Sequence, residues 1–254
     1  MPVDRPIVTL TSDFGLADAY VAAMKAAVLR HCPEANLIDI THQVPRQDIV
    51  AGSMALERAV AAFDEETVHL AVVDPGVGGP RRLAAALVRG QWIVCPDNGL
   101  MTWALRRWGP GETFEIIWRP RQASATFHGR DIMAPVAGWL ADAVRRDELL
   151  RPMDDPVLLD LHLAQNAGDG RVIHLDGFGN ATTNIPAELV GTDGYAKVWT
   201  EDREIGPLRR TYSDVAPGEA LALIGSSGLL EIAVRDGSGG QVLGLRVGDE
   251  VHWR

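Results

Sequence analysis

The stretch VHLAVVDPGVGGPR, residues 68–81, sets the fold class of this chain. Its first part, Val68–Val73, is a mostly aliphatic run that is typical of a strand buried inside a sheet. Asp74, Pro75 and Gly76 then break the strand with a turn. In α/β proteins, polar residues at the end of a buried strand mark the usual position of a ligand site.

On both sides of this stretch, strand-like and helix-like patterns alternate. We expect strands at Pro6–Leu10, Asn36–Ile40, Arg82–Val88, Trp92–Cys95 and Thr113–Trp118, and helices at Asp18–Arg30, Asp48–Phe63, Leu100–Trp108 and Ile132–Arg146. Asp18 and Asp48 suit the N-cap positions of the first two helices. The alternation predicts an α/β domain over residues 1–160, with a mostly parallel sheet sandwiched by helices.

The pattern changes after Arg151, where a segment rich in Pro, Asp and Gly resembles a linker. Beyond it we expect short strands separated by Gly-rich turns, at Arg171–Leu175, Ala196–Trp199, Ala220–Ile224, Leu229–Val234 and Val242–Leu245. These predict a smaller C-terminal all-β domain over residues 165–254.

Composition excludes several classes of protein. The 254 residues include 24 Lys plus Arg and 34 Asp plus Glu, so the net charge of −10 argues against nucleic-acid or anionic-membrane partners. Cys32 and Cys95 are expected to be buried, reduced thiols. The first ten residues, MPVDRPIVTL, do not form a signal peptide, and no apolar run is long enough to span a bilayer. We therefore expect a soluble, cytoplasmic protein.

Four polar, glycine-containing segments carry the candidate chemistry: TLTSDFG (9–15), AVVDPGVGGPR (71–81), TFHGRD (126–131) and DGFGNATTN (176–184). Asp13 follows a strand and either accepts hydrogen bonds from a ribose diol or only caps a turn or the following helix. The chain lacks GxGxxG and a P-loop lysine, so a phosphate ligand is not implied.

The second and third segments supply an acid, a cation and an imidazole. Arg81 either folds back onto the pocket of Asp74 or lies on the surface beyond an ordinary Asp-Pro-Gly turn. His128 precedes a helix start, where the positive end of the helix dipole favours a neutral imidazole that accepts protons. Arg130 and Asp131 are expected to brace that helix.

The C-terminal segments offer binding groups. Phe178 lies between glycines and offers a stacking face for a purine, while Asp176 and Asn180 can bind an amino group. The alternative is a tight hairpin turn. Ser226 and Ser227 either bind a carboxylate or make a turn. A metal site built from residues such as Asp13, Asp18, His42, His128 and Asp131 is disfavoured, because no HxxxH or HxH spacing is present.

As an ordered set, these segments resemble the S-adenosylmethionine hydroxide adenosyltransferase family, which is related to fluorinases and chlorinases. The resemblance extends to ITH at 40–42 and PDNGL at 96–100. It implies an enzyme that converts S-adenosylmethionine and water into adenosine and methionine. We expect no metal or other cofactor. The resemblance also implies a homotrimer whose active sites lie between the N-terminal domain of one subunit and the C-terminal domain of its neighbour.

The resemblance assigns roles to residues of both domains. Asp74, Arg81 and His128 correspond to the family's catalytic set, Asp13 to its ribose ligand, Asp176, Phe178 and Asn180 to groups around the nucleoside and the methionine amino group, and Ser226 or Ser227 to the serine beside the methionine carboxylate. This chain departs from the halogenating enzymes at Gln47 and at Val234–Gly237. Those departures leave the exact adenine and methionine contacts open.

Two alternatives stay open at this point: chloride transfer on the same scaffold, and nucleoside binding without turnover. The resemblance implies an aromatic residue at the position of Asp74 and no histidine at that of His128 in halogenases, which favours water as the nucleophile here. Either His128 or Asp74 could accept the proton from water. His128 is preferred, because the ordinary pKa of an aspartate, about 4, makes it a weak base.

Overall fold

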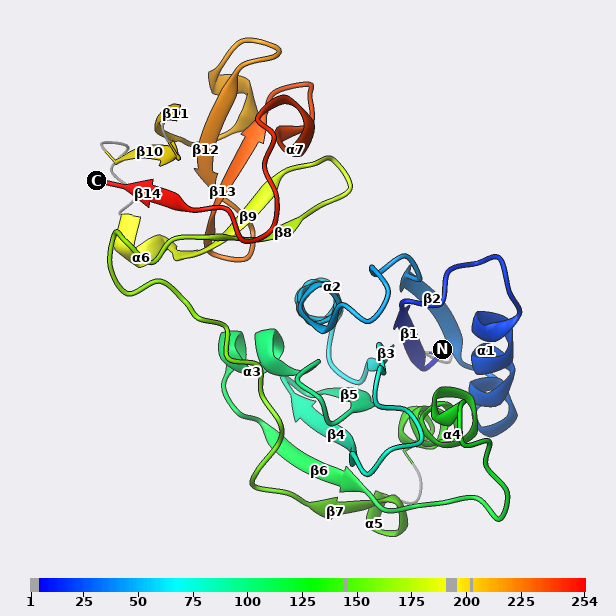
Figure 1. Ribbon diagram of the computed structural model, residues 1–254. Coiled ribbons are helices and arrows are strands. Elements are labelled where there is room, and N and C mark those ends of the chain that lie inside the picture. Colours follow the sequence, from blue (N-terminus) through cyan, green and yellow to red (C-terminus); the bar gives the residue numbers. More distant parts are fainter. Residues whose placement is uncertain (1–4, 144–145, 191–195, 202) are drawn as a thin grey trace. The chain divides into compact units, whose positions relative to one another are not determined.

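The computed structural model describes residues 5–143, 146–190, 196–201 and 203–254. The chain divides into two compact units, Met1–Leu159 and Asp160–Arg254 (Figure 1). Among the helices of these described ranges, none is long and apolar enough to cross a bilayer.

The first unit is built on a seven-stranded sheet with the order β2-β1-β3-β5-β4-β6-β7. Its strands are β1 Ile7–Ser12, β2 Asn36–Thr41, β3 Val68–Val72, β4 Leu83–Val88, β5 Gln91–Pro96, β6 Glu112–Ile116 and β7 Leu150–Pro152. The α/β class is confirmed. The sheet is parallel from β2 through β1 and β3 to β5, and its other pairs are antiparallel because β4 turns back beside β5.

Helices cover both faces of this sheet. They are α1 Tyr20–His31, α2 Ile49–Ala62, α3 Thr102–Trp108, a π-helical turn η1 Gly129–Met133 that leads into α4 Ala134–Ala141, and the short α5 Arg146–Leu149. Helices α1 and α4 pack against one another over one core, and α2 and α3 over the other.

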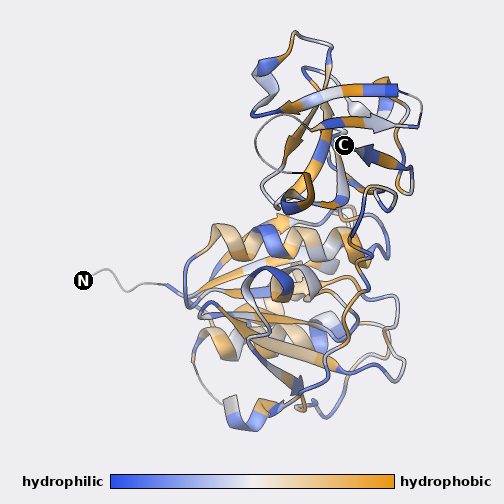
Figure 2. Ribbon diagram, turned by 90° about the vertical axis from the view of Figure 1, so that its left-hand side faces the viewer, coloured by the Kyte–Doolittle hydropathy of each residue, from blue (hydrophilic) through white to orange (hydrophobic). Residues whose placement is uncertain are grey.

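Strand β3 and the residue after it divide their side chains between the two cores. Val68, Leu70 and Val72 face the core of α1 and α4, whereas Ala71 and Val73 face that of α2 and α3. His69, the polar residue of this strand, is buried and contacts Thr9 Oγ1 at 2.7 Å and Gln91 Oε1 at 2.6 Å. Successive strand residues point to opposite faces, so a strand covered on both sides is otherwise apolar. Figure 2 shows this as hydrophobic colouring along the central strands.

Of the two predicted helix caps, one is confirmed. The carboxylate of Asp48 accepts a hydrogen bond from Ala51 N at 2.9 Å and caps α2. The prediction for Asp18 is wrong: α1 begins at Tyr20, its N-cap is Ala19, and no side chain caps it. Asp18 lies one residue too early for the geometry that an N-cap requires.

The second unit is an all-β unit with the sheet order β14-β10-β11-β12-β13-β9-β8. Its elements are β8 Val172–Leu175, β9 Ala181–Pro186, α6 Ala187–Val190, β10 Lys197–Thr200, β11 Arg203–Arg209, η2 Tyr212–Asp214, β12 Ala220–Ile224, β13 Leu229–Val234, α7 Gly239–Val242 and β14 Val251–Trp253. A bridge between Arg171 and Glu250 joins the neighbourhoods of β8 and β14, so the sheet curls back onto itself.

Sequence reading missed some elements of this unit and misassigned one. Strands β9, β11 and β14 were not expected, and the predicted strand Val242–Leu245 is wrong. Val242 ends α7, which Ser238 caps by accepting from Gln241 N at 3.3 Å. Short apolar runs do not distinguish a strand from a helical turn. Cys32 and Cys95 are buried free thiols, as expected.

Candidate active site

The site begins where β3 ends. Val77 N donates to Asp74 O at 3.2 Å and closes the expected turn. The side chains of Asp74 and Arg81 are only 5% and 11% exposed. Arg81 Nε donates to Asp74 Oδ1 at 2.7 Å, and its Nη2 donates to Asp74 Oδ2. This two-point contact fixes the direction of both groups.

Two glycines make this arrangement possible. A Cβ on Gly76 would lie 3.0 Å from Arg81 Cδ, where the arginine folds back over the turn. Gly78 has φ +79°, and a Cβ there would lie 2.6 Å from Ala125 O. Only glycine permits that backbone angle together with such a close approach. The loop after β3 is therefore held against the segment that leads to His128.

His128 completes a three-residue cluster. Arg81 Nη2 lies 3.1 Å from His128 Nδ1. A guanidinium has no acceptor, so it must donate here, and the neutral ring carries its proton on Nε2. Gly129 packs against Val72, with its Cβ position 3.2 Å from Val72 Cγ1, and so keeps the helix start beside the end of β3.

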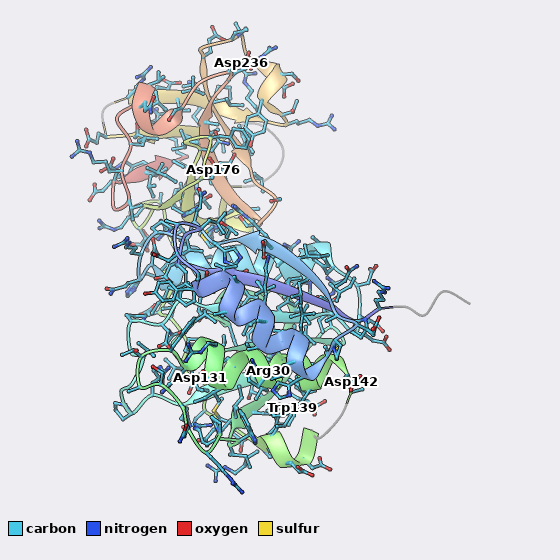
Figure 3. All side chains as sticks on the ribbon, turned by 90° about the vertical axis from the view of Figure 1, so that its right-hand side faces the viewer. Arg30, Asp131, Trp139, Asp142, Asp176 and Asp236 are labelled. Carbon is cyan, nitrogen blue, oxygen red and sulfur yellow. The ribbon has the colours of Figure 1, made fainter. Side chains whose placement is uncertain are left out.

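Electrostatics keep this imidazole uncharged. Burial lowers the pKa of His128, and the nearby positive charges of Arg81 and Arg119 lower it further, while Asp74 and Asp131 act in the opposite direction. The cause anticipated from the sequence was the helix dipole. Arg130 and Asp131 brace the helix start as expected, since Arg130 Nε donates to Asp131 Oδ1 at 2.6 Å and Ser124 N donates to Asp131 Oδ2 at 2.8 Å. Figure 3 labels Asp131 on this helix.

Asp13 is tied to the His128 segment through aromatic rings. Phe14 follows Asp13, Phe127 precedes His128, and the two rings pack edge to face with centroids 5.8 Å apart. Tyr20 packs against Phe127 at 5.4 Å. The loop after β1 and the start of η1 therefore belong to one surface, which brings Asp13 to the neighbourhood of the Asp74 cluster.

One oxygen of Asp13 is already occupied. Its Oδ2 accepts from Gln47 N at 2.8 Å. Gln47 has a positive φ of 63°, an unusual backbone conformation for a residue with a side chain. This contact orients the carboxylate, and over the described part of the chain Oδ1 accepts from no protein donor.

A hydrogen-bonded relay that the sequence reading missed begins at Ser12, next to Asp13; Ser12 and His42 are buried, whereas Asp39 is exposed. Ser12 Oγ contacts His42 Nδ1 at 2.7 Å, and His42 Nε2 contacts Asp39 Oδ1 at 3.0 Å. Lys25 Nζ donates to the other oxygen of Asp39 at 2.6 Å. Burial acts to raise the pKa of Asp39, but hydrogen bonds from Lys25 and His42 outweigh it and lower that pKa. The sequence signal for this relay was the ITH motif, which contains His42 but does not reveal its partners Ser12 and Asp39.

The remaining predicted residues lie in the second unit. Asp176 Oδ1 accepts from Phe178 N and Asn180 N, both at 2.9 Å, so Asp176 organises the turn between β8 and β9. Asn180 Nδ2 lies 3.3 Å from Asp176 Oδ2. Phe178 is 80% exposed. Both sequence readings of this segment therefore have support: it is a tight turn, and it presents an aromatic face. Figure 3 labels Asp176 in this unit.

Ser226 and Ser227 form the tip of the hairpin between β12 and β13. Glu231 lies close beneath that tip, because a Cβ on Gly225 would meet its Oε2 at 3.0 Å. Glu231 is a buried carboxylate, and it accepts from Tyr212 Oη at 2.6 Å. The sequence reading missed Glu231, although a single acid inside the apolar strand LLEIAV was a signal that could have indicated it.

Over the ranges that the structure describes, no three His, Cys, Asp or Glu side chains gather in a group that could hold a metal ion. Of the donors considered from the sequence, His42 contacts Ser12 and Asp39, and Asp131 contacts Arg130 and Ser124. The arrangement is therefore an acid–guanidinium–imidazole cluster at the carboxyl end of a central strand.

The protein therefore belongs to a class with two units: an α/β unit that carries a polar site at the end of a central strand, and a curled β unit that follows it. Models of both halves of one family match the chain: the SAM hydroxide adenosyltransferase N-terminal domain over residues 8–149 and the C-terminal domain over residues 170–252. The chain belongs to the SAM hydroxide adenosyltransferase family.

Individual relatives agree over nearly the full length. A protein of Thermus thermophilus named (R)-S-adenosyl-L-methionine hydrolase is 41% identical, with 96% of this chain and 97% of the relative covered. A fluorinase of Nocardia brasiliensis is more distant, at 29% identity with 90% of each chain covered. The crystal structure of an uncharacterized conserved protein from Thermotoga maritima superposes with a TM-score of 0.86 at 36% identity, covering 98% of this chain and 100% of that one.

Proposed function

We propose that this chain is an enzyme that hydrolyses S-adenosyl-L-methionine to adenosine and L-methionine. The observation that carries the proposal is the contact of Arg81 with both Asp74 and His128, in a chain of the hydroxide adenosyltransferase family. The names of its relatives as S-adenosyl-L-methionine hydrolases over nearly the full chain support the same reaction.

The reaction is a displacement at the 5′ carbon of the nucleoside. The oxygen of water forms a bond to that carbon while the carbon–sulfur bond breaks, and the bonding electron pair leaves with sulfur as the neutral thioether of methionine. The sulfonium needs no protonation to leave. The only proton to remove is one from the attacking water.

Magnitudes show that water is not ionised in advance. Lowering the pKa of water from about 15.7 to the working pH would require about 9 units, or roughly 12 kcal/mol. General-base assistance during the attack contributes about 10²–10⁴-fold. Holding water and carbon in line contributes roughly 7–11 kcal/mol. The cluster therefore acts by aligning water and by taking its proton as the new bond forms.

The geometry favours Asp74 over His128 as the proton acceptor, in contrast to the preference drawn from the sequence. His128 Nδ1 receives Arg81 Nη2, so the lone pair of the neutral ring is already engaged. The ring offers an Nε2–H donor, which suits holding the oxygen of water. Each carboxylate oxygen of Asp74 keeps a second lone pair beyond the one that Arg81 uses. Arg81 then stabilises Asp74 and the attacking water as charge develops.

The other predicted residues serve as substrate ligands in this proposal. Asp13 Oδ1 would accept from the ribose diol, and Phe178 would stack on the adenine. Asp176, Asn180 and the hairpin of Ser226 and Ser227 would hold the methionine end. As the family resemblance implies, we also propose a cytoplasmic homotrimer in which each site combines the first unit of one subunit with the second unit of its neighbour.

The relatives' names add a stereochemical detail. They specify the R configuration of S-adenosyl-L-methionine, which the sequence reading had left undefined. We extend that preference to this chain. The two epimers differ at sulfur, next to the reacting carbon, so a site that aligns water with the carbon–sulfur bond would discriminate between them.

Product analysis tests the proposal. The purified protein, mixed separately with each sulfonium epimer, should release adenosine and methionine in equal amounts and faster from the R epimer. Activity should survive EDTA. Added chloride should give no 5′-chloro-5′-deoxyadenosine, and that product would instead establish halide transfer. Tight adenosine binding in calorimetry, without methionine release over hours, would instead identify a nucleoside-binding protein.

Two substitutions test the cluster. His128→Ala and Asp74→Ala should each slow adenosine release by about tenfold or more, because alignment or proton removal is lost. Substrate should still bind both variants in calorimetry. Full activity in both would remove the cluster from the mechanism.

A further inference from the structure

The turn after β5, PDNGL at Pro96–Leu100, lies directly behind the residues that carry the cluster. Asn98 Nδ2 donates to Val73 O at 2.9 Å, and Asn98 Oδ1 accepts from Leu100 N at 3.3 Å. One side-chain amide therefore links the carbonyl that precedes Asp74 to the chain that enters α3.

The Asn98 amide bonds to the chain after β3, just beyond the point where its ladder with β5 ends. The parallel ladder between β3 and β5 ends at the pair Leu70–Val94. Val73 lies beyond it and is fully buried, so its carbonyl needs a hydrogen-bond partner other than water. Asn98 supplies that partner. It thereby fixes the peptide that sets the direction of the next side chain, Asp74.

The neighbouring residue Asp97 holds the backbone next to Arg81, through Arg82. Its side chain is 1% exposed, and it accepts from Arg82 Nε at 2.8 Å and from Val157 N at 2.7 Å. Asp97 N also donates to Arg82 O at 3.1 Å. Arg82 directly follows Arg81. Two consecutive residues thus hold the backbone next to both members of the Asp74–Arg81 pair.

We propose that Asn98 is a positioning residue for the hydrolysis: its amide holds the Val73–Asp74 peptide so that the Asp74 carboxylate meets Arg81 in the two-point contact. The inference rests on the proposed function and adds a residue to it. A shift of about 1 Å in a reacting group costs about 10²-fold in rate. Both printed contacts of the Asn98 amide are with backbone atoms, so it acts through Asp74.

The test compares variants of one turn in the full-length protein. Asn98→Ala removes both hydrogen bonds, and Asn98→Asp keeps the acceptor for Leu100 N but loses the donor to Val73 O. Both should lower kcat about tenfold or more, with KM changed less than about threefold, because the loss is one of alignment. If Asn98 only stabilised the start of α3, Asn98→Asp would keep wild-type kcat.

Thr102→Val is the matched control. It removes two hydrogen bonds of the same turn, Thr102 Oγ1 to Gly99 O at 2.7 Å and Leu159 N to Thr102 Oγ1 at 2.8 Å, and makes no change near Val73. Its kcat should stay within about twofold of wild type, since alignment is retained. An equal loss of kcat in Thr102→Val and Asn98→Ala would overturn the proposal.

A second readout does not depend on activity. If Asp74 and Arg81 move apart, Arg81 leaves His128 Nδ1, and the pKa of His128, followed by NMR titration of its imidazole, should rise. It should rise in both Asn98 variants and stay unchanged in Thr102→Val. An unchanged titration in a folded Asn98 variant contradicts the inference. A wild-type protein that does not hydrolyse the substrate refutes the proposed function, while the titration still decides the role of Asn98.

Discussion

At the residue scale, one guanidinium serves two partners. Arg81 directs Nε and Nη2 to Asp74, and the same Nη2 reaches His128 Nδ1. Such a planar fork fixes the relative orientation of all three groups, which a single ammonium on a flexible stem does not.

Arg81→Lys therefore tests geometry at constant charge. We expect a loss in kcat of about tenfold or more, because lysine cannot make the two-point contact and reach the imidazole as well. The measurement is the steady-state rate of adenosine release. Arg121→Lys, at an exposed position of the loop before His128, is the control and should keep the wild-type rate. Wild-type activity in Arg81→Lys would mean that charge alone is sufficient.

The pH dependence of hydrolysis belongs to the same scale. Burial and Arg81 lower the pKa of His128 below its ordinary value of about 6.5. The neutral ring then persists from alkaline pH down through 6.5, and protonation of Nδ1 at lower pH breaks its contact with Arg81. The rate should stay flat from about pH 8 to 6.5 and fall only below that. A fall centred above pH 7 would contradict this assignment.

At the element scale, the two predicted caps give a paired experiment on stability. Asp48→Ala removes the hydrogen bond to Ala51 N and should lower the free energy of unfolding by about 1 kcal/mol. Asp18→Ala removes no cap and should change it by less than about 0.5 kcal/mol. Urea unfolding of both variants checks this. Equal losses would show that both aspartates act only through the helix dipole.

In the second unit, local sequence patterns explain which strands were predicted and which were missed. Strands with long apolar runs, such as Leu229–Val234, were expected correctly because burial on both faces leaves a local signature. Strand β11, Arg203–Arg209, contains Gly206 and Pro207, which usually mark a break. Its pairing with β10 and β12 outweighs those local preferences.

At the scale of the whole molecule, each unit has cores of its own. The buried clusters of the first unit draw only on residues up to Met153, and the large cluster of the second unit draws only on residues from Ala164 onward. A chain that buries its apolar side chains within one segment can fold as that segment.

A fragment of residues 1–159 should therefore fold and unfold cooperatively by circular dichroism. It should not release adenosine at a measurable rate, because the proposed ligands Asp176, Phe178 and Asn180 are missing. The intact protein is the control for both measurements. A fragment with the full rate would exclude the second unit from the site, and an unfolded fragment would show that the first unit depends on the second.

The amino-acid sequence by itself determined the alternation of strands and helices, the polar breaks after the strands and the residue types available there. These are local properties, since hydrophobic period and turn chemistry act over a few neighbouring residues. It therefore identified Asp74, Arg81 and His128 as candidates, and left open whether Arg81 folds back.

Only the tertiary structure decided which groups meet. The contact of Arg81 with His128, the approach of Gly78 to Ala125 and the hydrogen bond from Asn98 to Val73 join segments that are 25 to 47 positions apart. Their geometry depends on strand order and on where each ladder ends, which no local pattern encodes. The proton position on His128 follows from the same packing, because it is set by the donor that the fold places against Nδ1.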